Sequence, residues 1–458
     1  MARYRFTWLC VLALSAIAFA DDFDLPELPA AKNAPAKDAP AKEMSAKDAP
    51  ASQSAPEESD YDGPVNFAPI EATNVGDSRK ASAQALPTGI VAKKIPENLN
   101  RPLKVGVYTG VKELYLKLDG ETIHVTAAGN KVKFQGKENT ATLDSKEIHS
   151  EGKCIAIAPT TKELATACYP GVFNITAKGG QLNAINEVDV EEYLRGVVPY
   201  EIGKLDSSRF SALESQAIAA RTYVYKHFGS RESLGFDVYA DTKDQVYKGL
   251  NSATPLTDSA VKATAGIVMV YDGQFITAYY HSTCGGHTET LATWGKPDLP
   301  YLQSKPDMRD DGTPWCNESS YTKWERTFSD KEAETLIRKN GAEAKAKVPD
   351  FKKIKSIDIK DTLAGGRILT LEVVTDKGKF SVAGDRVRWL FKKNGSILPS
   401  SLFRISHKKS EWKIEGSGFG HGVGMCQMGV RARAAAGQDF ATILTHYYPG
   451  ITLERFEK

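Results

Sequence analysis

The sequence of 458 residues predicts an α+β fold with a strand-rich first section, a long central helix and a mixed remainder. Short stretches of alternating apolar and polar residues, separated by glycine turns, fill residues 98–187. The period then changes to a three-four apolar spacing between Phe210 and Phe228, which is typical of a long helix. Strand and helix patterns follow without regular alternation, so a parallel α/β sheet is not expected.

The individual elements follow from these periods and from the turn residues between them. In the first section we expect strands at residues 104–108, 113–118, 122–126, 131–134, 155–158, 173–177 and 182–185. A short helix at 189–194 precedes the long helix, for which Ser207 or Ser208 is the expected N-cap. Further along we expect strands at 267–271, 275–281, 354–359, 368–375 and 379–382, and helices at 332–339 and 428–436.

Residues 1–20 have the pattern of a secretory signal peptide. Arg3 and Arg5 precede a largely apolar stretch, and Ala-Phe-Ala at 18–20 is a small-residue cleavage site before Asp21. The apolar stretch is short for a membrane span, although an uncleaved anchor is the alternative. No other segment is apolar enough to cross a bilayer. We therefore expect a protein that is exported to the periplasm or cell envelope, with no transmembrane span in the mature chain.

Residues 21–97 are predicted to be a disordered linker rich in Ala, Pro and Lys. A lysine recurs every five residues, at Lys32, Lys37, Lys42 and Lys47, in a background that cannot build a core. An arm that touches the anionic cell wall is the alternative. A β-rich section at 98–187 and a second, mixed region at 188–458 should make up the folded chain.

Charge and cysteine content narrow the class of protein. Lys and Arg number 59 against 57 for Asp and Glu, so no strong field favours nucleic acid. Of the 6 cysteines, Cys10 falls in the signal peptide, and an odd number then remains in an oxidising compartment. At least one is therefore unpaired unless a metal takes some. Cys154 and Cys168 lie close in sequence and are expected to form a local disulfide.

Four segments, taken in order, carry a resemblance to a known family. They are VEEYLRGVVPYEI (190–202) with ESQAIAARTYV (214–224), DTKDQVYKG (241–249), YYHSTCGGHTE (279–289), and GFGHGVGMCQ (418–427) with HYYPG (446–450). In this order they are similar to the SpoIID/LytB family over roughly residues 102–455. A single glycine-rich stretch would be weak, but four ordered segments are specific.

The resemblance implies that residues 188–458 are the catalytic region. It implies a mixed domain with a cleft that cuts the glycan strands of peptidoglycan as a lytic transglycosylase. The family's catalytic glutamate falls in the Val-Val-Pro-x-Glu segment, which assigns Glu201 here. It also implies action on strands already stripped of stem peptides, often beside an amidase, and LytB-type members were named as modifiers of an amidase. Cys426 stands where many members have Ser, and Met428 where an aromatic residue is common.

The chemistry of glycan cleavage is consistent with a single glutamate. Breaking a glycosidic bond requires a proton on the leaving oxygen. A lytic transglycosylase can then use the substrate's own tethered 6-hydroxyl, and the same group takes its proton while a 1,6-anhydro ring closes. Glu201 must be protonated at rest, and the apolar residues around it at 197–202 would raise its pKa. A surface acid just ahead of a helix is the alternative.

A possible metal site lies in the third segment. His281, Cys284 and His287 form a His-x2-Cys-x2-His cluster around two glycines, and imidazole and thiolate suit a structural Zn²⁺. Cys284 joined to Cys316 or Cys426 in a disulfide is one alternative. Simple hydrogen bonding by the histidines is another.

Four further residues are candidates for substrate binding. His421 and Gln427 would line the cleft near Glu201, unless the glycines around them form only a packed turn. Arg221 would pair with a carboxylate in the cleft, unless it lies on a solvated helix face. Tyr247 would stack on a sugar ring, although a buried core aromatic is the commoner case.

Two alternative functions follow from the same residues. The first is a non-catalytic peptidoglycan-binding protein that enhances an amidase. The second is a zinc-dependent wall amidase built on His281, Cys284 and His287, although the chain lacks a His-Glu-x-x-His helix.

Overall fold

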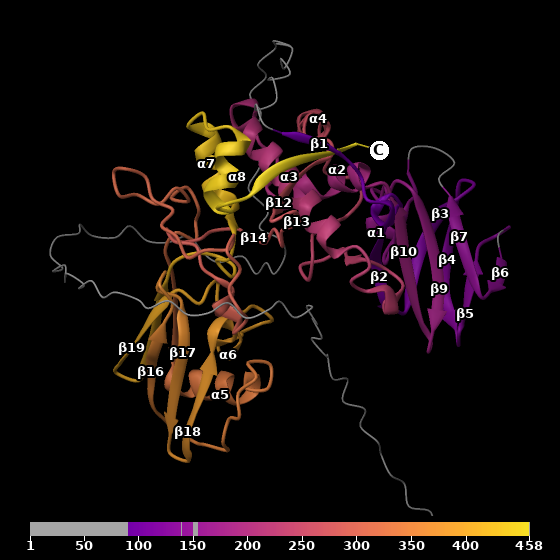
Figure 1. Cartoon of the computed structure of the whole chain (residues 1–458). Coiled ribbons are helices and arrows are strands. Elements are labelled where there is room, and N and C mark those ends of the chain that lie inside the picture. The colour runs from indigo at the N-terminus through magenta and orange to yellow at the C-terminus, as the bar shows by residue number, and fades with distance from the viewer. Residues whose placement is uncertain (1–89, 139, 150–153, 458) are drawn as a thin grey trace, which may run out of the picture. The chain divides into compact units, whose positions relative to one another are not determined.

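Strands and helices are mixed along the chain in the computed structural model, which describes residues 90–138, 140–149 and 154–457 (Figure 1). The predicted α+β class is confirmed. The expected signal peptide, and the linker as far as residue 89, lie outside the described residues. Within the described part of the chain, none of the helices combines the length and hydropathy that a membrane span requires.

The elements have the following bounds. The helices are α1 Thr161–Leu164, α2 Val190–Glu201, α3 Phe210–His227, α4 Pro255–Ala263, α5 Asp330–Asn340, α6 Val387–Leu390, α7 Gln427–Ala435 and α8 Phe440–Tyr447. The strands up to α4 are β1 Val91–Lys94, β2 Leu103–Val111, β3 Glu113–Leu118, β4 Glu121–Ala128, β5 Lys131–Gln135, β6 Thr140–Leu143, β7 Ser145–His149, β8 Ile157–Ala158, β9 Val172–Lys178, β10 Gln181–Val188 and β11 Val238–Tyr239. The later strands are β12 Ile267–Tyr271, β13 Gln274–Phe275, β14 Tyr280–His281, β15 Trp324–Ser329, β16 Ile354–Thr362, β17 Ile368–Thr375, β18 Gly378–Ala383, β19 Phe403–Lys408, β20 Glu411–Gly416, β21 Met425–Cys426 and β22 Thr452–Glu457.

Two five-stranded sheets form the first section, as the alternating pattern predicts. Their strand orders are β11-β2-β10-β9-β7 and β6-β5-β4-β3-β8. Alternate residues such as Leu182 and Ala184 in β10 are buried, and so are Phe173 and Ile175 in β9. Strands β6 and β7 are additional to the prediction. Their only buried residue is Ile148, so the sequence contains no alternation from which to predict them.

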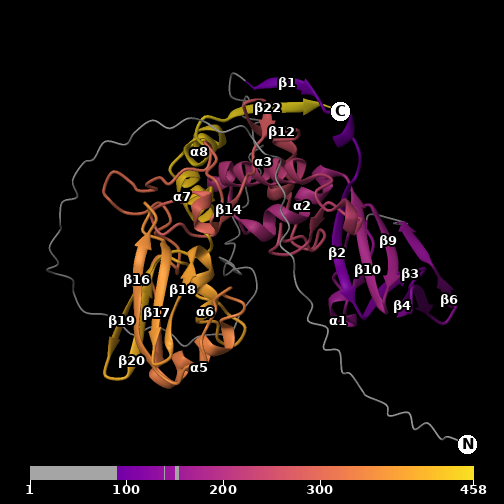
Figure 2. The same ribbon diagram turned by 60° about the horizontal axis from the view of Figure 1, so that its bottom comes forward.

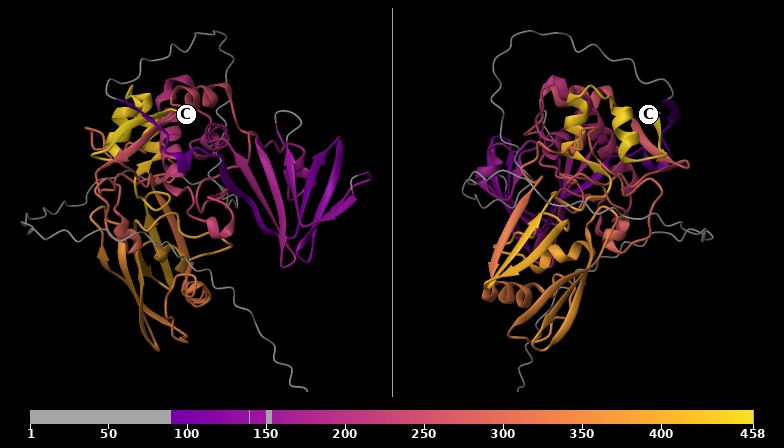
Figure 3. Two further views of the ribbon diagram at one scale, coloured as in Figure 1. Left: turned by 45° about the vertical axis from the view of Figure 1, so that its right-hand side comes forward. Right: turned by 90° about the vertical axis from the view of Figure 1, so that its left-hand side faces the viewer.

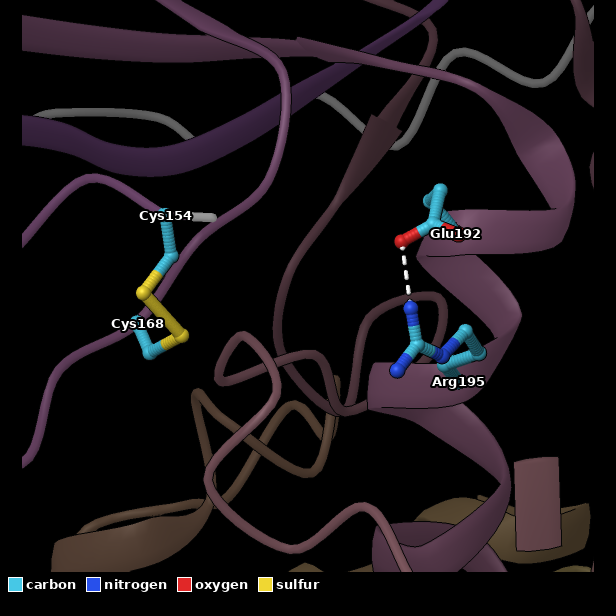
Figure 4. Close-up of a disulfide and its surroundings, with 4 residues drawn as sticks. All are labelled: Cys154, Cys168, Glu192 and Arg195. Carbon is cyan, nitrogen blue, oxygen red and sulfur yellow. Dashed lines mark hydrogen bonds and ion pairs between the residues drawn. A yellow bond between two sulfur atoms is a disulfide. The ribbon is translucent and has the colours of Figure 1, made fainter. Parts of the chain in front are cut away.

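A disulfide joins Cys154 and Cys168, the pair singled out from the sequence (Figure 4). The two Cα atoms are 5.0 Å apart. An antiparallel bridge between Ile155 and Tyr169 brings the two cysteines together. A cross-link over a loop of this size contributes roughly 3 kcal/mol in the chain-entropy model.

Helix α2 is longer than predicted and ends at Glu201. Its N-cap is Asp189, whose side chain accepts a hydrogen bond from the N–H of Glu191. The sequence suggested an end at residue 194, but the helix continues through Pro199. A proline so close to the end removes only one hydrogen bond within the helix, and the buried side chains around it offset that loss. Arg195 and Glu192 are half-buried and form an ion pair across one turn of the helix (Figure 4).

Helix α3 lies at the centre of the larger hydrophobic core and packs against α2, α4, α7, α8 and β12. It is buried over most of its surface, including polar residues such as Gln216 and Arg221. The predicted cap is corrected. Asp206 caps the short 3-10 turn before α3 by accepting the N–H of Ser208, and the serines do not cap the helix themselves.

The folded chain begins earlier than the sequence suggested. Strand β1 lies within the predicted linker, yet it pairs in parallel with the C-terminal strand β22 (Figure 2). Lys93 forms an ion pair with Glu454 at 2.5 Å, and Ile95 after the strand is buried. All four side chains of β1 are exposed, so the pattern contains no buried face by which to recognise the strand.

A truncation tests this correction. A chain that begins at residue 90 should have the same free energy of unfolding as the chain that begins at Asp21. A chain that begins at residue 98 loses β1 and buried Ile95, and should be less stable by about 2–3 kcal/mol. Chemical denaturation of the three chains gives the comparison, and equal stability of all three would contradict the role of β1.

A second hydrophobic core lies between Trp324 and Ile414. Two three-stranded sheets, β15-β20-β19 and β16-β17-β18, pack there with α5 and α6, in the orange part of the ribbon (Figure 3). This part of the chain, called the inserted unit below, lies between the third and fourth of the segments noted above, within the region at 188–458 that was expected to be catalytic.

Candidate functional site

Glu201 is the last residue of α2, and two other segments hold its carboxyl group. Oε1 accepts a hydrogen bond from the backbone N–H of Val246 at 2.7 Å. Oε2 lies 3.4 Å from Nε2 of Gln427, the first residue of α7. Glu201 itself is half-buried. Segments that are far apart in the sequence therefore meet at one carboxyl group.

The pKa of Glu201 is raised from its usual 4.5 to about 7, chiefly because burial disfavours the charged carboxylate. The Val246 N–H, the Gln427 side chain and the nearby Tyr280 hydroxyl act in the opposite direction. That hydroxyl is buried and, among the described residues, has no partner at ordinary hydrogen-bond geometry. Roughly half of the Glu201 carboxyl groups therefore carry a proton near pH 7, and most of them do below that pH.

Gln427 connects Glu201 to the core. Its Nε2 lies 3.3 Å from Oε1 of Gln216 on α3, and both glutamines are buried. Within the described part of the chain, Nε2 of Gln216 has no hydrogen-bond partner. The amide of Gln427 is thus oriented toward Glu201 from a rigid helix, as a group that positions a carboxyl should be.

The third and fourth segments lie side by side through β14 and β21. These strands pair in parallel, with Tyr280 opposite Met425 and His281 opposite Cys426. His281 Nδ1 donates to the carbonyl of Val423 at 3.2 Å. This pairing places Gln427 next to the strand that carries Tyr280, which explains how both reach Glu201.

His421 lies in an aromatic setting within the fourth segment. Its ring packs against Trp294, Tyr279 and His281. Its Nδ1 accepts the N–H of Val423, and burial lowers its pKa to about 4, so the ring is neutral at neutral pH. Its role in substrate binding stays a prediction.

The inserted unit is fastened to this loop by Arg367, which is fully buried. Its guanidinium donates to the carbonyls of Gly420 at 3.0 Å and Cys284 at 3.2 Å. Gly422 has a φ of +83°, and a Cβ there would lie 2.2 Å from Nε of Arg367. The glycine is therefore required both by its backbone conformation and by the close approach of Arg367.

Arg221 does not serve the role predicted for it. Its side chain is wholly buried on α3 and forms two hydrogen bonds of 2.7 Å with the carboxylate of Glu191. It also donates to the carbonyls of Ile267 and Val261. The prediction of substrate binding is corrected: Arg221 joins α2, α3 and the segments after α4.

Tyr247 is also corrected. Its ring is 1% exposed and packs against Tyr193 and Tyr169. Its hydroxyl donates to the side-chain oxygen of Asn186 at 3.0 Å. A ring enclosed in this way cannot stack on a sugar, so Tyr247 is a core residue.

The predicted ligand set of His281, Cys284 and His287 is not assembled. His287 Nδ1 bonds the carbonyl of Thr288, and His281 faces Val423. In the described chain, the residues whose potential ligand atoms converge are instead Cys284, Cys316 and Cys426. The wall-amidase alternative loses the ligands on which it was based.

Some residues of the site could not be identified from the sequence. Val246 contributes its backbone N–H, so the type of its side chain gives no indication of this role. Gln216 lies in a helix whose polar residues looked solvent-facing. Arg367 lies in the inserted unit, outside all the segments noted above.

Part of the site lies in a segment that matches a known protein family. Residues 178–271 match the family described as stage II sporulation protein, SpoIID, and residues 311–424 match a domain of unknown function, DUF8618. The second match coincides with the inserted unit. The first contains Glu201 and Val246, but not Gln427.

The chain is also similar to several curated proteins. The amidase enhancer of Bacillus subtilis is 32% identical over 295 residues, which are 57% of this chain and 40% of that protein. The stage II sporulation protein D of Bacillus subtilis is 25% identical over 320 residues, 66% of this chain and 85% of that protein. A protein of Brachyspira hyodysenteriae is 29% identical over 281 residues, 60% of this chain and 69% of that protein.

The segment that matches the SpoIID model places a half-buried acid, Glu201, at the end of a helix, and the relatives bear the names amidase enhancer and stage II sporulation protein D. The resemblance to the SpoIID/LytB family noted in the sequence is confirmed by this family match and by these relatives.

Proposed function

We propose that this protein is an exported lytic transglycosylase that cuts the glycan strands of peptidoglycan. Similarity to the SpoIID family and to the amidase enhancer supports a role at the cell wall. The observation that carries the finer proposal is Glu201, whose pKa of about 7 keeps a proton available on a half-buried carboxyl group. A general acid of this kind is what glycosidic cleavage requires.

The proposed reaction uses one carboxyl group twice. Val246 holds Oε1, so Oε2 is the oxygen that gives its proton to the glycosidic oxygen as the bond from that oxygen to C1 breaks. The resulting carboxylate is stabilised by the amide of Gln427. The 6-hydroxyl of the same sugar then bonds to C1, and its proton returns to Glu201. No water is consumed, and the product carries a 1,6-anhydro end.

Mass spectrometry of naked glycan strands tests the proposal. Incubation with the purified protein should release fragments with anhydro ends, each lighter than the hydrolysis product by one water. Fragments with reducing ends instead would make the protein a hydrolase. No fragments at all would count against catalysis.

The second candidate is a non-catalytic enhancer of a wall amidase, favoured by the relative that bears the name amidase enhancer. An amidase is then the partner, and peptidoglycan the surface on which both act. The two candidates separate in one assay with intact peptidoglycan. The enhancer would speed release of stem peptides by an added amidase, and Glu201→Gln would enhance as well as the unaltered protein.

The pH dependence of cleavage should follow the pKa of Glu201. Because the acid form is the reactive one and its pKa is raised to about 7, kcat/KM should fall about tenfold per pH unit well above pH 7. Rates from pH 5 to 9 measure this. Glu214 has a pKa also raised to about 7 by burial, so Glu214→Gln is the control and should keep the same falling limb. If the falling limb disappears in Glu214→Gln, the group that titrates is Glu214 and the assignment to Glu201 is wrong.

A further inference from the structure

Three cysteines from separate segments converge beside the site. Cys284 follows β14, Cys316 lies in the loop before β15, and Cys426 ends β21 and caps α7. All three are buried, and their sulfur atoms lie within 4.8 Å of one another. The sulfur atoms of Cys284 and Cys316 are 3.5 Å apart. None of these cysteines is in the disulfide already described.

The distances can be compared with two kinds of sulfur chemistry. Sulfur atoms in a disulfide are about 2.05 Å apart. Two thiolates that each lie about 2.3 Å from a tetrahedral zinc ion are about 3.8 Å apart. The separation of 3.5 Å between Cys284 and Cys316 is close to the second value. A disulfide would also pair only two of the three and leave a buried thiol.

Backbone N–H groups point at the sulfur atoms. Gly286 N–H donates to Cys284 Sγ at 3.3 Å. Cys426 Sγ accepts the N–H of Cys284 at 3.2 Å and that of Gly429, in the first turn of α7, at 3.4 Å. A neutral thiol is a weak acceptor, whereas a thiolate accepts strongly. This donor set suits sulfur atoms that carry negative charge, and several buried negative charges require a cation among them.

Outer groups of fixed orientation surround the cluster. Asp307 Oδ2 lies 3.3 Å from Cys284 Sγ and also accepts from the hydroxyl of Tyr447 at 2.9 Å. Asp307 Oδ1 is paired with Arg433 at 2.8 Å. Such partners hold ligands in place around metal sites. Asp307 therefore lies beside the cluster as a partner held in place by Tyr447 and Arg433.

We propose that Cys284, Cys316 and Cys426 bind one zinc ion as a structural site. Thiolates select a soft or borderline ion, and Zn²⁺ is bound by three or four ligands of this type without redox change. The ion would join β14, the loop before β15 and the start of α7. Gln427 follows Cys426 directly, so the ion would also fix the amide that faces Glu201. The site stands independently of the proposed glycan cleavage.

Metal content of the chain from Asp21 onward provides the test. Protein purified without chelators should contain about one zinc ion per chain by elemental analysis. Cys284→Ser, Cys316→Ser and Cys426→Ser should each lower this to below about 0.2, with a lower melting temperature, because metal binding is coupled to folding. His281→Asn and His287→Asn are the matched controls and should keep the zinc. Cys154→Ser with Cys168→Ser should keep it too.

A second measurement covers the case in which a cysteine variant does not fold. The unaltered chain refolded with Co²⁺ should show intense thiolate-to-cobalt charge-transfer absorption, which histidine and carboxylate ligands do not produce. Zinc-free protein with three titratable thiols would overturn the proposal. So would a Cys284–Cys316 disulfide found by peptide mapping, or loss of zinc in the histidine variants with retention in Cys316→Ser.

Discussion

Glu201→Gln should lower the rate of anhydro-end formation by at least about 10²-fold and up to about 10⁴-fold, because an amide cannot deliver or take the proton. The substitution should disturb the fold little. The new amide oxygen can accept the N–H of Val246, and Gln427 and Gln216 can turn their amides together to avoid facing two donors. Quantified fragments from naked glycan measure the rate, and a glycan pull-down should show binding intact.

Glu214→Gln is the matched control for this substitution. Glu214 is buried, its pKa is also raised to about 7, and it lies on the neighbouring helix α3. Both variants remove a carboxyl group from a low-dielectric setting, so a general effect of burial would appear in both. A variant of Glu201 that cleaves at the original rate, while that of Glu214 does not, would show that the acid is misassigned.

Arg221→Met should lower the free energy of unfolding by about 3 kcal/mol, while the folded fraction keeps its activity within about twofold. The reason is the buried pair: removing the guanidinium leaves the carboxylate of Glu191 and the carbonyls of Ile267 and Val261 without their partner. Glu191 is 29% exposed, so water relieves part of the cost, and we take the lower end of the usual range. Urea denaturation and rates per folded molecule measure both effects.

The double variant Arg221→Met with Glu191→Met separates a structural pair from a binding residue. Replacing both charges by apolar groups should recover most of the lost stability, because no charge is then left without a partner. An increase in KM for glycan at unchanged stability would instead support the role in substrate binding that the structure corrects.

The sequence predicts well those features that depend on local period. The first-section strands repeat every two residues, and α3 repeats every three or four, so both are visible without tertiary information. Strand β1 has no buried face, and its pairing with β22 depends on residues at the other end of the chain. Pro199 illustrates another limit, because packing offsets a local preference that would end the helix.

The site was predicted in part for the same reason. Glu201 stands in a distinctive segment, so a resemblance can assign it. Arg221 and Tyr247 stand in equally distinctive segments, but their partners, Glu191 and Asn186, turn them toward the core. Cys284 could be recognised as a possible ligand, whereas its neighbours in space come from loops that only the fold brings together. For a polar residue in a distinctive segment, the role therefore becomes clear only when its hydrogen-bond partner in the fold is known.

The contact between Glu201 and Gln427 has a consequence for the order of folding. These residues are separated by 226 positions, and the pair that links β1 to β22 by 361. Closing such loops carries an entropy cost that must be met before the contacts form, so they should form late. During refolding from urea, helical signal should return first and glycan cleavage last. A partly synthesised chain would then carry a folded first section but no working acid, which delays activity until the chain is complete.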